Sequence, residues 1–451
     1  MEGRVVVVGA GPTGLWLASE LRLAGVEVVV LEARTGRDPN SKALTVHPRT
    51  LEVFACRGVA ERFVRSGVPI PSGHFGALDE RLDFRGLDTP FPYTLFLPQA
   101  RTEELLEEHA LAVGARVLRG HRVTGVAQDA DGVTVTATGL AEPLRAAYVV
   151  GCDGTRSTVR EAAGIGFPGT DSTTWGWLAD VVLDEPLTAP LTASGPDGLL
   201  MAVPLPGGAC RLVGVDPANR PGTPTLAEVV SAVIRITGSD LGVREARWLS
   251  RFGNATRQAT AYRRGRVLLA GDAAHQHFPT GGVGLNVGVQ DAANLGWKLA
   301  ETVHGTAPDG LLDTYHAERH PVGVELLRST RAQTALMTAH TVEGQALREV
   351  ISARIADVPE FGRALAESLS ALAVAYPAGP DEHPLTGTRA PNLEFADGDL
   401  FTLLHPGRPV LLDFTGGDLA GRPVALTGDR PAWAAVRTAL IRPDGHVAWA
   451  A

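Results

Sequence analysis

The feature that most constrains the fold is a glycine-rich turn near the N-terminus. Residues 4–8 form a short valine-rich run, and the sequence Gly9-Ala-Gly-Pro-Thr-Gly14 follows it directly. Residues 15–24 then show the apolar spacing of a helix, and residues 26–31 form a second apolar run that ends at Glu32. This order of strand, glycine turn, helix, strand and acid is typical of a dinucleotide-binding βαβ unit.

The three glycines of this turn have separate physical roles. Gly9 permits a tight turn, Gly11 lets a pyrophosphate approach the backbone, and Gly14 lets the helix pack closely on the strand. The N-terminus of the helix offers free N–H groups and a partial positive charge to phosphates. Glu32 can accept hydrogen bonds from a ribose, so residues 1–32 are predicted to bind a dinucleotide.

Two further glycine–acid clusters stand far along the chain, at residues 151–154 and 271–272. Each follows an apolar run that predicts a buried strand, at residues 144–150 and 266–270. Open α/β sheets bind ligands at the carboxyl ends of their strands, so we expect the three clusters to meet there. An ordinary tight turn is enough to account for one isolated glycine cluster. Three clusters in this order instead favour a nucleotide-binding site.

The rest of the chain alternates between helical and strand patterns. Helices are predicted at residues 101–112, 286–303 and 311–340, with the last interrupted at Pro321. A hairpin is predicted around residues 129–132. Segments near 73–97 and 172–260 alternate apolar and polar residues, which predicts an antiparallel sheet inserted into the nucleotide-binding core. From about residue 386 we expect a small tail domain of short strands.

Composition excludes several classes of protein. The 451 residues contain 41 Lys and Arg against 50 Asp and Glu, which gives a net charge of −9, and 44% are hydrophobic. This usage is that of a globular protein. The acidic balance argues against nucleic acid or an anionic membrane as a partner, and no apolar run approaches the roughly 20 residues that span a bilayer. The widely spaced Cys56, Cys152 and Cys210 form no metal or disulfide pattern, so we expect a cytoplasmic protein.

Taken together, the three clusters resemble the FAD signatures of the group A flavoprotein aromatic monooxygenases. Residues 151–160 resemble the family's "DG" motif, and residues 271–286 resemble its "GD" motif and flavin loop. Further similar segments are residues 41–54, 98–99, 291–299 and 315–321. The likeness is strongest to hydroxylases of aromatic polyketides and to rifampicin monooxygenases, and residues 441–449 resemble the tail of that subgroup. The resemblance covers nearly the whole chain.

The resemblance implies an α/β fold with three domains. A Rossmann-like FAD-binding domain would comprise residues 1–72, 98–171 and 262–385, and an inserted antiparallel β-sheet substrate domain would comprise residues 73–97 and 172–261. Residues 386–451 would form a small C-terminal thioredoxin-like domain. Relatives usually continue beyond Trp449 with a final helix, so we expect this domain to be truncated. It has no cysteine, so thiol redox chemistry is excluded there.

The resemblance also implies the activity. FAD would be the cofactor, with NADPH or NADH and O2 as co-substrates, and a C4a-hydroperoxyflavin would hydroxylate a bulky polycyclic aromatic of polyketide type. The flavin carries the difficult step, so the protein must orient the ring and exclude water, and no essential protein base is expected. The expected partner is this small molecule, and the protein would be a monomer or a homodimer.

The residues expected to bind FAD, by resemblance, are Gly9, Gly11, Gly14, Glu32, Ala33, Lys42, Gln99, Arg101, Asp153, Gly271, Asp272, Pro279, Gly282, Gly284, Leu285 and Asn286. Pro279, Gly281 and Gly282 would line the flavin, and helix 286–303 would aim its positive N-terminus at the flavin N1–C2=O edge. The family pattern has arginine at position 42, and Lys42 is not its equivalent in a bidentate contact. Aromatic residues expected to line the substrate pocket are Phe75, Phe96, Trp175, Trp177 and Phe278.

Other readings of the same residues are weaker or stay open. The pair His275 and His277 lacks partners at metal-ligand spacing, so no metal is expected. Trp175-Gly-Trp177 lacks the Ile-Pro that follows it in flavin halogenases. Three alternative functions remain: a monooxygenase that inactivates an aromatic antibiotic, a Baeyer–Villiger monooxygenase, and a flavoprotein that sequesters a drug without turnover.

Overall fold

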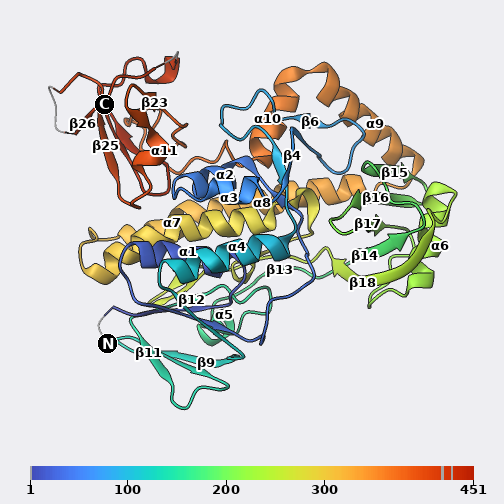
Figure 1. Ribbon diagram of the computed structural model, residues 1–451, viewed down its shortest axis with the longest axis horizontal. Helices are drawn as coiled ribbons and strands as arrows, with labels where there is room; N and C mark the ends of the chain where they lie inside the picture. Colours follow the sequence, from blue (N-terminus) through green and yellow to red (C-terminus); the bar gives the residue numbers. More distant parts are fainter. Residues whose placement is uncertain (1–2, 418–420, 428–429) are drawn as a thin grey trace.

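A six-stranded sheet forms the centre of the computed structural model, which describes residues 3–417, 421–427 and 430–451 (Figure 1). Its strand order is β20-β21-β12-β1-β2-β8. The strands are β20 (Arg263–Arg264), β21 (Val267–Leu269), β12 (Tyr148–Gly151), β1 (Val5–Val8), β2 (Val28–Glu32) and β8 (Arg116–Arg119). All neighbours pair in parallel except β20 and β21. Continuous valine runs suit such strands, because both faces of a parallel sheet are buried.

Helix α1 (Pro12–Leu23) packs on strands β1 and β2 of this sheet, and α4 (Gln99–Ala112) and α7 (Gly284–His304) pack beside α1. The predicted βαβ unit is therefore confirmed, with α1 between the parallel strands β1 and β2. Helix α1 contacts both α4 and α7. At Gly296 in α7 a Cβ atom would lie 2.5 Å from the Cβ of Glu20, so glycine is needed for the close approach of α7 to α1.

A second sheet, entirely antiparallel, lies at one side of the molecule (Figure 1). Its order is β15-β16-β17-β14-β18. The strands are β14 (Trp175–Leu183), β15 (Leu191–Gly195), β16 (Gly198–Pro204), β17 (Ala209–Val215) and β18 (Val243–Gly253). Helix α6 (Leu226–Thr237) packs against it, and Val229 and Val233 of α6 share a buried core with Trp177 and Leu212 of the sheet. This is the predicted inserted antiparallel sheet.

Segment 73–97 was expected to join the same sheet, but its strands pair elsewhere. Strands β5 (Ser72–Gly73) and β6 (Leu82–Asp83) pair with each other, and β7 (Thr94–Phe96) pairs with β3 (Thr45–Val46) and β4 (Val68–Ile70). Alternation of apolar and polar residues indicates a half-buried strand, but it does not identify the partner strand.

The helical region differs from the prediction at Pro321. Helix α8 (Thr314–Met337) runs through this proline without interruption and ends earlier than expected. Proline cannot donate to the carbonyl of Ala317, four residues earlier. Both residues are exposed, so water can bond to that carbonyl and the helix continues. Helices α9 (Val342–Asp357) and α10 (Pro359–Leu369), which the sequence did not predict, follow α8.

The C-terminal residues form a separate core around a four-stranded sheet in the order β26-β25-β27-β28. The strands are β25 (Val410–Asp413), β26 (Arg422–Pro423), β27 (Thr438–Ile441) and β28 (Val447–Ala450), and the short helix α11 (Leu400–Leu403) precedes them. Arg57 ties this core to the rest of the protein, because its guanidinium pairs with Glu20 at 2.6 Å and donates to the carbonyls of Leu404 and Pro443. The thioredoxin-like character of this region stays a prediction.

The described helices include none that is both long enough and apolar enough to cross a bilayer.

Candidate cofactor and substrate site

The three glycine–acid clusters meet at one edge of the parallel sheet. Gly9 follows β1, Gly151 ends β12 and Gly271 follows β21, and these three strands are parallel neighbours. The approach is close: a Cβ atom on Gly9 would lie 2.4 Å from the carbonyl oxygen of Cys152. The prediction that the clusters converge at strand carboxyl ends is therefore confirmed.

The N-terminus of α1 is open to a ligand. Its N-cap residue, Gly11, provides no side-chain hydrogen bond, and the first turn contains no acidic residue. A Cβ atom on Gly11 would meet nothing within 4 Å among the described residues, whereas one on Gly14 would lie 2.0 Å from the carbonyl oxygen of Gly9. Gly14 is thus required by packing, and the free N–H groups beside Gly11 suit a phosphate.

Glu32 holds this turn through both of its carboxylate oxygens. They accept hydrogen bonds from the backbone N–H groups of Ala10 and Arg34, each at 2.8 Å. A carboxylate has further lone pairs, so Glu32 can still accept from a ribose hydroxyl. Ala33, directly after it, is half-buried.

The flavin-loop segment, residues 279–286, is fixed by two residues that lie far apart in the sequence. The side chain of Asn286 donates to the Gly282 carbonyl at 2.9 Å and accepts from the backbone N–H of His47 at 2.7 Å. The His47 imidazole donates through Nε2 to the Gly281 carbonyl at 2.8 Å. Burial lowers the pKa of His47 to about 4, so the ring is neutral at pH 7. No local sequence pattern indicates this role for His47.

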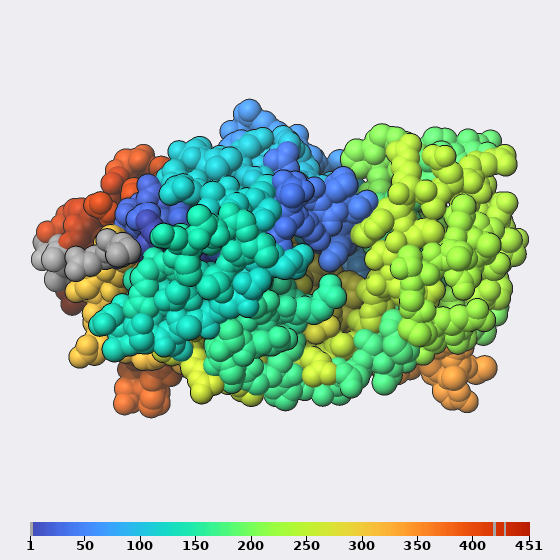
Figure 2. All heavy atoms as spheres, turned by 90° about the horizontal axis from the view of Figure 1, so that it is seen from below, coloured from blue at the N-terminus to red at the C-terminus, as the bar shows by residue number. Residues whose placement is uncertain are grey.

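The flavin loop is partly exposed and lies next to the N-terminus of helix α7. Asp272 and Pro279 are exposed, and Gly282, Gly284 and Leu285 are half-buried. Helix α7 begins at Gly284 without a side-chain cap or an acidic residue in its first turn, so its N–H groups are free for a ligand. Figure 2 shows the surface hollowed between the blue N-terminal segment and the yellow-green residues of the antiparallel sheet.

The remaining residues expected to bind FAD have differing surroundings. Gln99, at the start of α4, accepts from the backbone N–H of Ala43 at 3.0 Å and so positions the loop that carries the exposed Lys42. Arg101 pairs with Glu104. Asp153 accepts from the hydroxyl of Ser157 at 2.5 Å and therefore shapes the chain at the start of helix α5 (Thr158–Ala162).

Asp291 in α7 stabilises the segment that contains Gly271 and His275, a role that no local sequence pattern indicates. Its carboxylate accepts from the backbone N–H of Gly271 at 3.1 Å, from His275 Nε2 at 2.8 Å and from Arg319 Nε at 2.7 Å. Burial alone would raise the pKa of Asp291, but the charge of Arg319 and the hydrogen bonds from Arg319 and His275 outweigh it and leave the pKa below its usual value. The His275 side chain is thus engaged by the Asp291 carboxylate. Within the described ranges no three or more His, Cys, Asp or Glu side chains are grouped so that they could hold a metal.

The five aromatic residues expected to line a substrate pocket do not lie together. Phe278 packs on Phe252 with a ring separation of 5.0 Å. Trp177 is only 3% exposed and donates to Asp216 at 3.1 Å, so it is part of the core beneath α6. Phe96 and Trp175 are half-buried. Phe75 lines a cavity of about 290 Å³.

The face of the antiparallel sheet opposite α6 is the strongest candidate for a substrate wall. Because side chains alternate between the faces of a strand, those paired with Gly176 and Leu178 point away from α6. They include Val213, Ser250 and Phe252, which are half-buried. Phe278, next to the flavin loop, packs against this face together with Leu199 and Val215. A mainly apolar part of this face thus adjoins the loop.

Comparison with known proteins places these features in a family context. Residues 2–330 match the FAD binding domain family, and residues 383–451 match the family described as aromatic-ring hydroxylase, C-terminal. An uncharacterized aromatic compound monooxygenase of Bacillus subtilis is 46% identical over 476 residues, which cover 100% of this chain and 94% of the relative. Rifampicin monooxygenase of Streptomyces venezuelae is 46% identical over 461 residues, covering 99% and 95%. The solved structure of OxyS anhydrotetracycline hydroxylase from Streptomyces rimosus is 44% identical, with a TM-score of 0.91 and coverage of 100% and 96%.

Proposed function

Because the chain belongs to the FAD-binding family of aromatic-ring hydroxylases, we propose that it hydroxylates a bulky polycyclic aromatic molecule of polyketide type. It is an FAD-dependent monooxygenase, and NAD(P)H and O2 are the usual co-substrates in this family. The substrate class is supported by relatives named for rifampicin and for anhydrotetracycline.

The residues at the sheet edge fit FAD. Gly11 and the uncapped N-terminus of α1 offer space and N–H donors for the pyrophosphate, and Glu32 lies at the end of β2 for the ribose. Exposed Asp272 would hold the ribityl chain, and residues 279–286 would hold the isoalloxazine ring beside the free N–H groups of α7. When bound, FAD supplies hydride acceptance and oxygen activation.

The chain itself has to position the aromatic ring and keep water away. The part of the sheet face that carries Val213 and Phe252 is mainly apolar and adjoins Phe278, so a flat ring can stack there next to the flavin loop. His47 and Asn286 hold the loop against strand β3, so they would position the loop that would hold the flavin. These are positioning tasks, for which no ionisable catalytic side chain is required.

The observation that carries the proposal is the meeting of the three glycine clusters beside an apolar sheet face. The test is incubation of the FAD-loaded protein with NADPH and either anhydrotetracycline or rifampicin, with NADPH consumption and product mass both measured. We expect one compound to stimulate NADPH oxidation and to gain one oxygen atom. Tight binding without oxidation of NADPH would instead indicate a sequestering protein.

The relative named for rifampicin favours one second candidate, inactivation of an aromatic antibiotic. Both candidates use the same cofactor, so the product decides between them: loss of antibacterial activity of the oxidised rifampicin would support inactivation. Proton NMR of the product distinguishes ring hydroxylation from the lactone that a Baeyer–Villiger reaction forms.

We also propose a cytoplasmic protein that is a monomer or a homodimer. Free thiols support a reducing compartment: Cys56, Cys152 and Cys210 are all unpaired with one another, and burial raises the pKa of Cys56 to about 12, which keeps it protonated and unreactive.

A further inference from the structure

One turn of the C-terminal region, residues 442–446 between strands β27 and β28, contacts the helices that carry the flavin loop. Asp444 in this turn is buried, and its carboxylate accepts from Nε1 of Trp297 in α7 at 3.4 Å. Arg442 in the same turn pairs with Glu318 in α8 at 2.9 Å. The turn is therefore packed into the FAD-binding core, and no step of the proposed function uses it.

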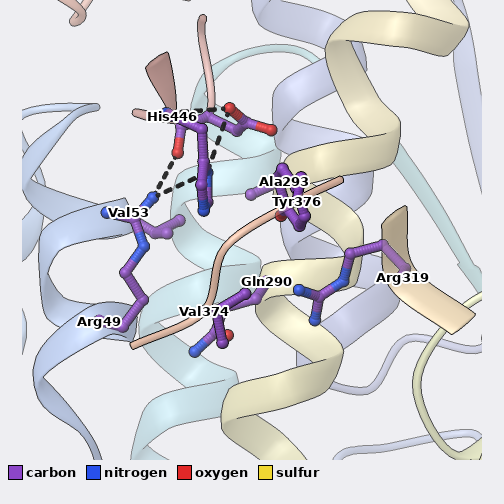
Figure 3. Close-up of a pocket in the computed structure, with 9 residues that line it drawn as sticks. Arg49, Val53, Gln290, Ala293, Arg319, Val374, Tyr376 and His446 are labelled. Carbon is purple, nitrogen blue, oxygen red and sulfur yellow. Dashed lines mark hydrogen bonds and ion pairs between the residues drawn. The ribbon is translucent and has the colours of Figure 1, made fainter. Parts of the chain in front are cut away.

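The same turn also bonds to helix α2 (Pro48–Ala55), whose N-cap residue is His47. Arg49, in the first turn of α2, donates through Nη2 to the carbonyl of Asp444 at 2.6 Å. Figure 3 shows the Arg49 side chain extending from α2 towards the segment that carries His446. One guanidinium thus joins the C-terminal region to the helix turn that directly follows His47.

A buried carboxylate makes this connection rigid. Glu52 in α2 is 0% exposed, and it accepts from Nη1 of Arg49 and from Nη1 of Arg389, each at 2.9 Å. Arg389 also belongs to the C-terminal region, residues 383–451. Breaking a buried ion pair is costly, so α2 is held firmly from this side. The packing is close as well, because a Cβ atom on Gly445 would lie 3.2 Å from Nη2 of Arg49.

Helix α2 links this contact to the flavin loop. Residues 48–54 are all buried, so the short helix moves as one unit with the residue that precedes it. That residue is His47, which donates to Asn286 Oδ1 and to the carbonyl of Gly281. A displacement of α2 would therefore change both hydrogen bonds at once.

We propose that Arg49 is a positioning residue for FAD, which transmits the position of the 442–446 turn through α2 and His47 to the flavin loop. The C-terminal region thereby sets how well residues 279–286 receive the isoalloxazine ring. This inference rests on the place given to the isoalloxazine under the proposed function, and it is independent of which aromatic molecule is hydroxylated.

The test compares the affinity of the apoprotein for FAD with that for ADP, by titration calorimetry of the whole chain. ADP has the pyrophosphate and ribose that α1 and Glu32 would bind, but it has no ring to reach the flavin loop. Arg49→Lys keeps a cation beside Glu52 but lacks the planar fork that bonds to two acceptors. Its dissociation constant for FAD should rise about fivefold, and that for ADP should not change. Unchanged FAD affinity, or an equal loss for ADP, would overturn the proposal.

Arg57→Lys is the matched control. Arg57 is also a buried arginine that bonds to this turn, through the carbonyl of Pro443 at 3.0 Å, but it follows the end of α2 and pairs with Glu20 of α1. Thermal denaturation of the apoproteins should show a loss of stability in both variants, and only Arg49→Lys should lose FAD affinity. An equal loss of FAD affinity in Arg57→Lys would show that general docking of the C-terminal region controls the site, which contradicts a path through α2.

A double-mutant cycle tests the path itself. If Arg49 acts through His47, Arg49→Lys should weaken FAD binding about fivefold in the wild-type background but by less than about twofold in His47→Gln. Two losses that multiply in full would show independent effects and overturn the proposal. A wild-type apoprotein that binds neither FAD nor ADP would refute the FAD site and this proposal with it, so the two failures are distinguishable.

Discussion

The backbone N–H of His47 donates to Oδ1 of Asn286 over 2.7 Å, although the two residues are 239 positions apart. The same histidine donates through Nε2 to the carbonyl of Gly281, so one residue holds the flavin loop at two points. Gly281 has a positive φ of 65°, a conformation that glycine adopts without strain, and these hydrogen bonds fix the loop in it. His47 is therefore a positioning residue for the loop.

His47→Gln should loosen this loop and weaken FAD binding. Loss of one well-placed buried hydrogen bond costs about 1 kcal/mol or more, which corresponds to a several-fold rise in the dissociation constant of FAD. The measurement is a titration of the apoprotein with FAD, followed by quenching of flavin fluorescence. His304→Gln changes an exposed histidine at the far end of α7 and is the control. Equal FAD affinity in both variants would contradict the role given to His47.

Gly11→Ala and Gly14→Ala should fail in different ways. A Cβ at position 11 meets nothing within 4 Å in the described structure, so the variant should fold but lose FAD affinity, because the methyl group occupies the space of the pyrophosphate. A Cβ at position 14 lies 2.0 Å from a backbone oxygen, so that variant should lose thermal stability as well. Thermal denaturation of the apoproteins checks this difference, with Gly36→Ala, also unobstructed, as control. Normal FAD binding in Gly11→Ala would contradict the assignment.

Asp291→Asn should destabilise the protein strongly. The substitution leaves Arg319, whose side chain is 0% exposed, as a buried cation without its carboxylate. Breaking a buried pair in this way costs about 3–5 kcal/mol in the free energy of unfolding. Asp313→Asn removes an exposed partner of Arg263 and should change stability by less than about 1 kcal/mol. Urea denaturation measures both, and similar losses in the two variants would show that the Asp291 cluster is not structural.

Stability should fall in mild acid because of buried histidines, of which His47 and His446 are two and His74, whose pKa burial also lowers to about 4, is a third. Burial lowers the pKa of His47 and of His446 to about 4, against 6.5 for an exposed imidazole. Between pH 6.5 and 4 the unfolded chain binds a proton at each position and the folded chain does not, so the free energy of unfolding decreases as the pH falls through this window. Each histidine contributes about 1.4 kcal/mol per pH unit. Denaturation curves at pH 7 and 5 should show a shallower decline in His47→Gln, and an unchanged decline would refute the assigned pKa.

Much of the nucleotide site could be predicted from the sequence because its signals are local. The turn at Gly9–Gly14 and the clusters at 151–154 and 271–272 each follow their own strand directly, and parallel pairing then brings them to one edge. The uncapped start of α7 is likewise visible as a glycine-rich stretch before a helix.

Contacts between distant segments could not be predicted. The bond from His47 to Asn286 joins two helix starts that have no common sequence pattern. Trp177 was expected near a pocket, but alternation along β14 turns it towards α6, and a strand pattern alone does not say which face is covered. The passage of α8 through Pro321 depends on the exposure of Ala317, which is a property of the packed structure.

The central claim is that bound FAD reacts with NADPH under control of an aromatic substrate, and anaerobic stopped-flow spectroscopy tests it most directly. The purified protein should show flavin bands at about 370 and 450 nm, and NADPH should bleach the latter faster by about tenfold or more when anhydrotetracycline or rifampicin is present, as substrate-gated flavin reduction requires. A colourless protein that does not take up added FAD would contradict the assignment of FAD as the cofactor. If NADPH does not bleach the bound flavin in the presence of any aromatic compound, this result would contradict the monooxygenase activity.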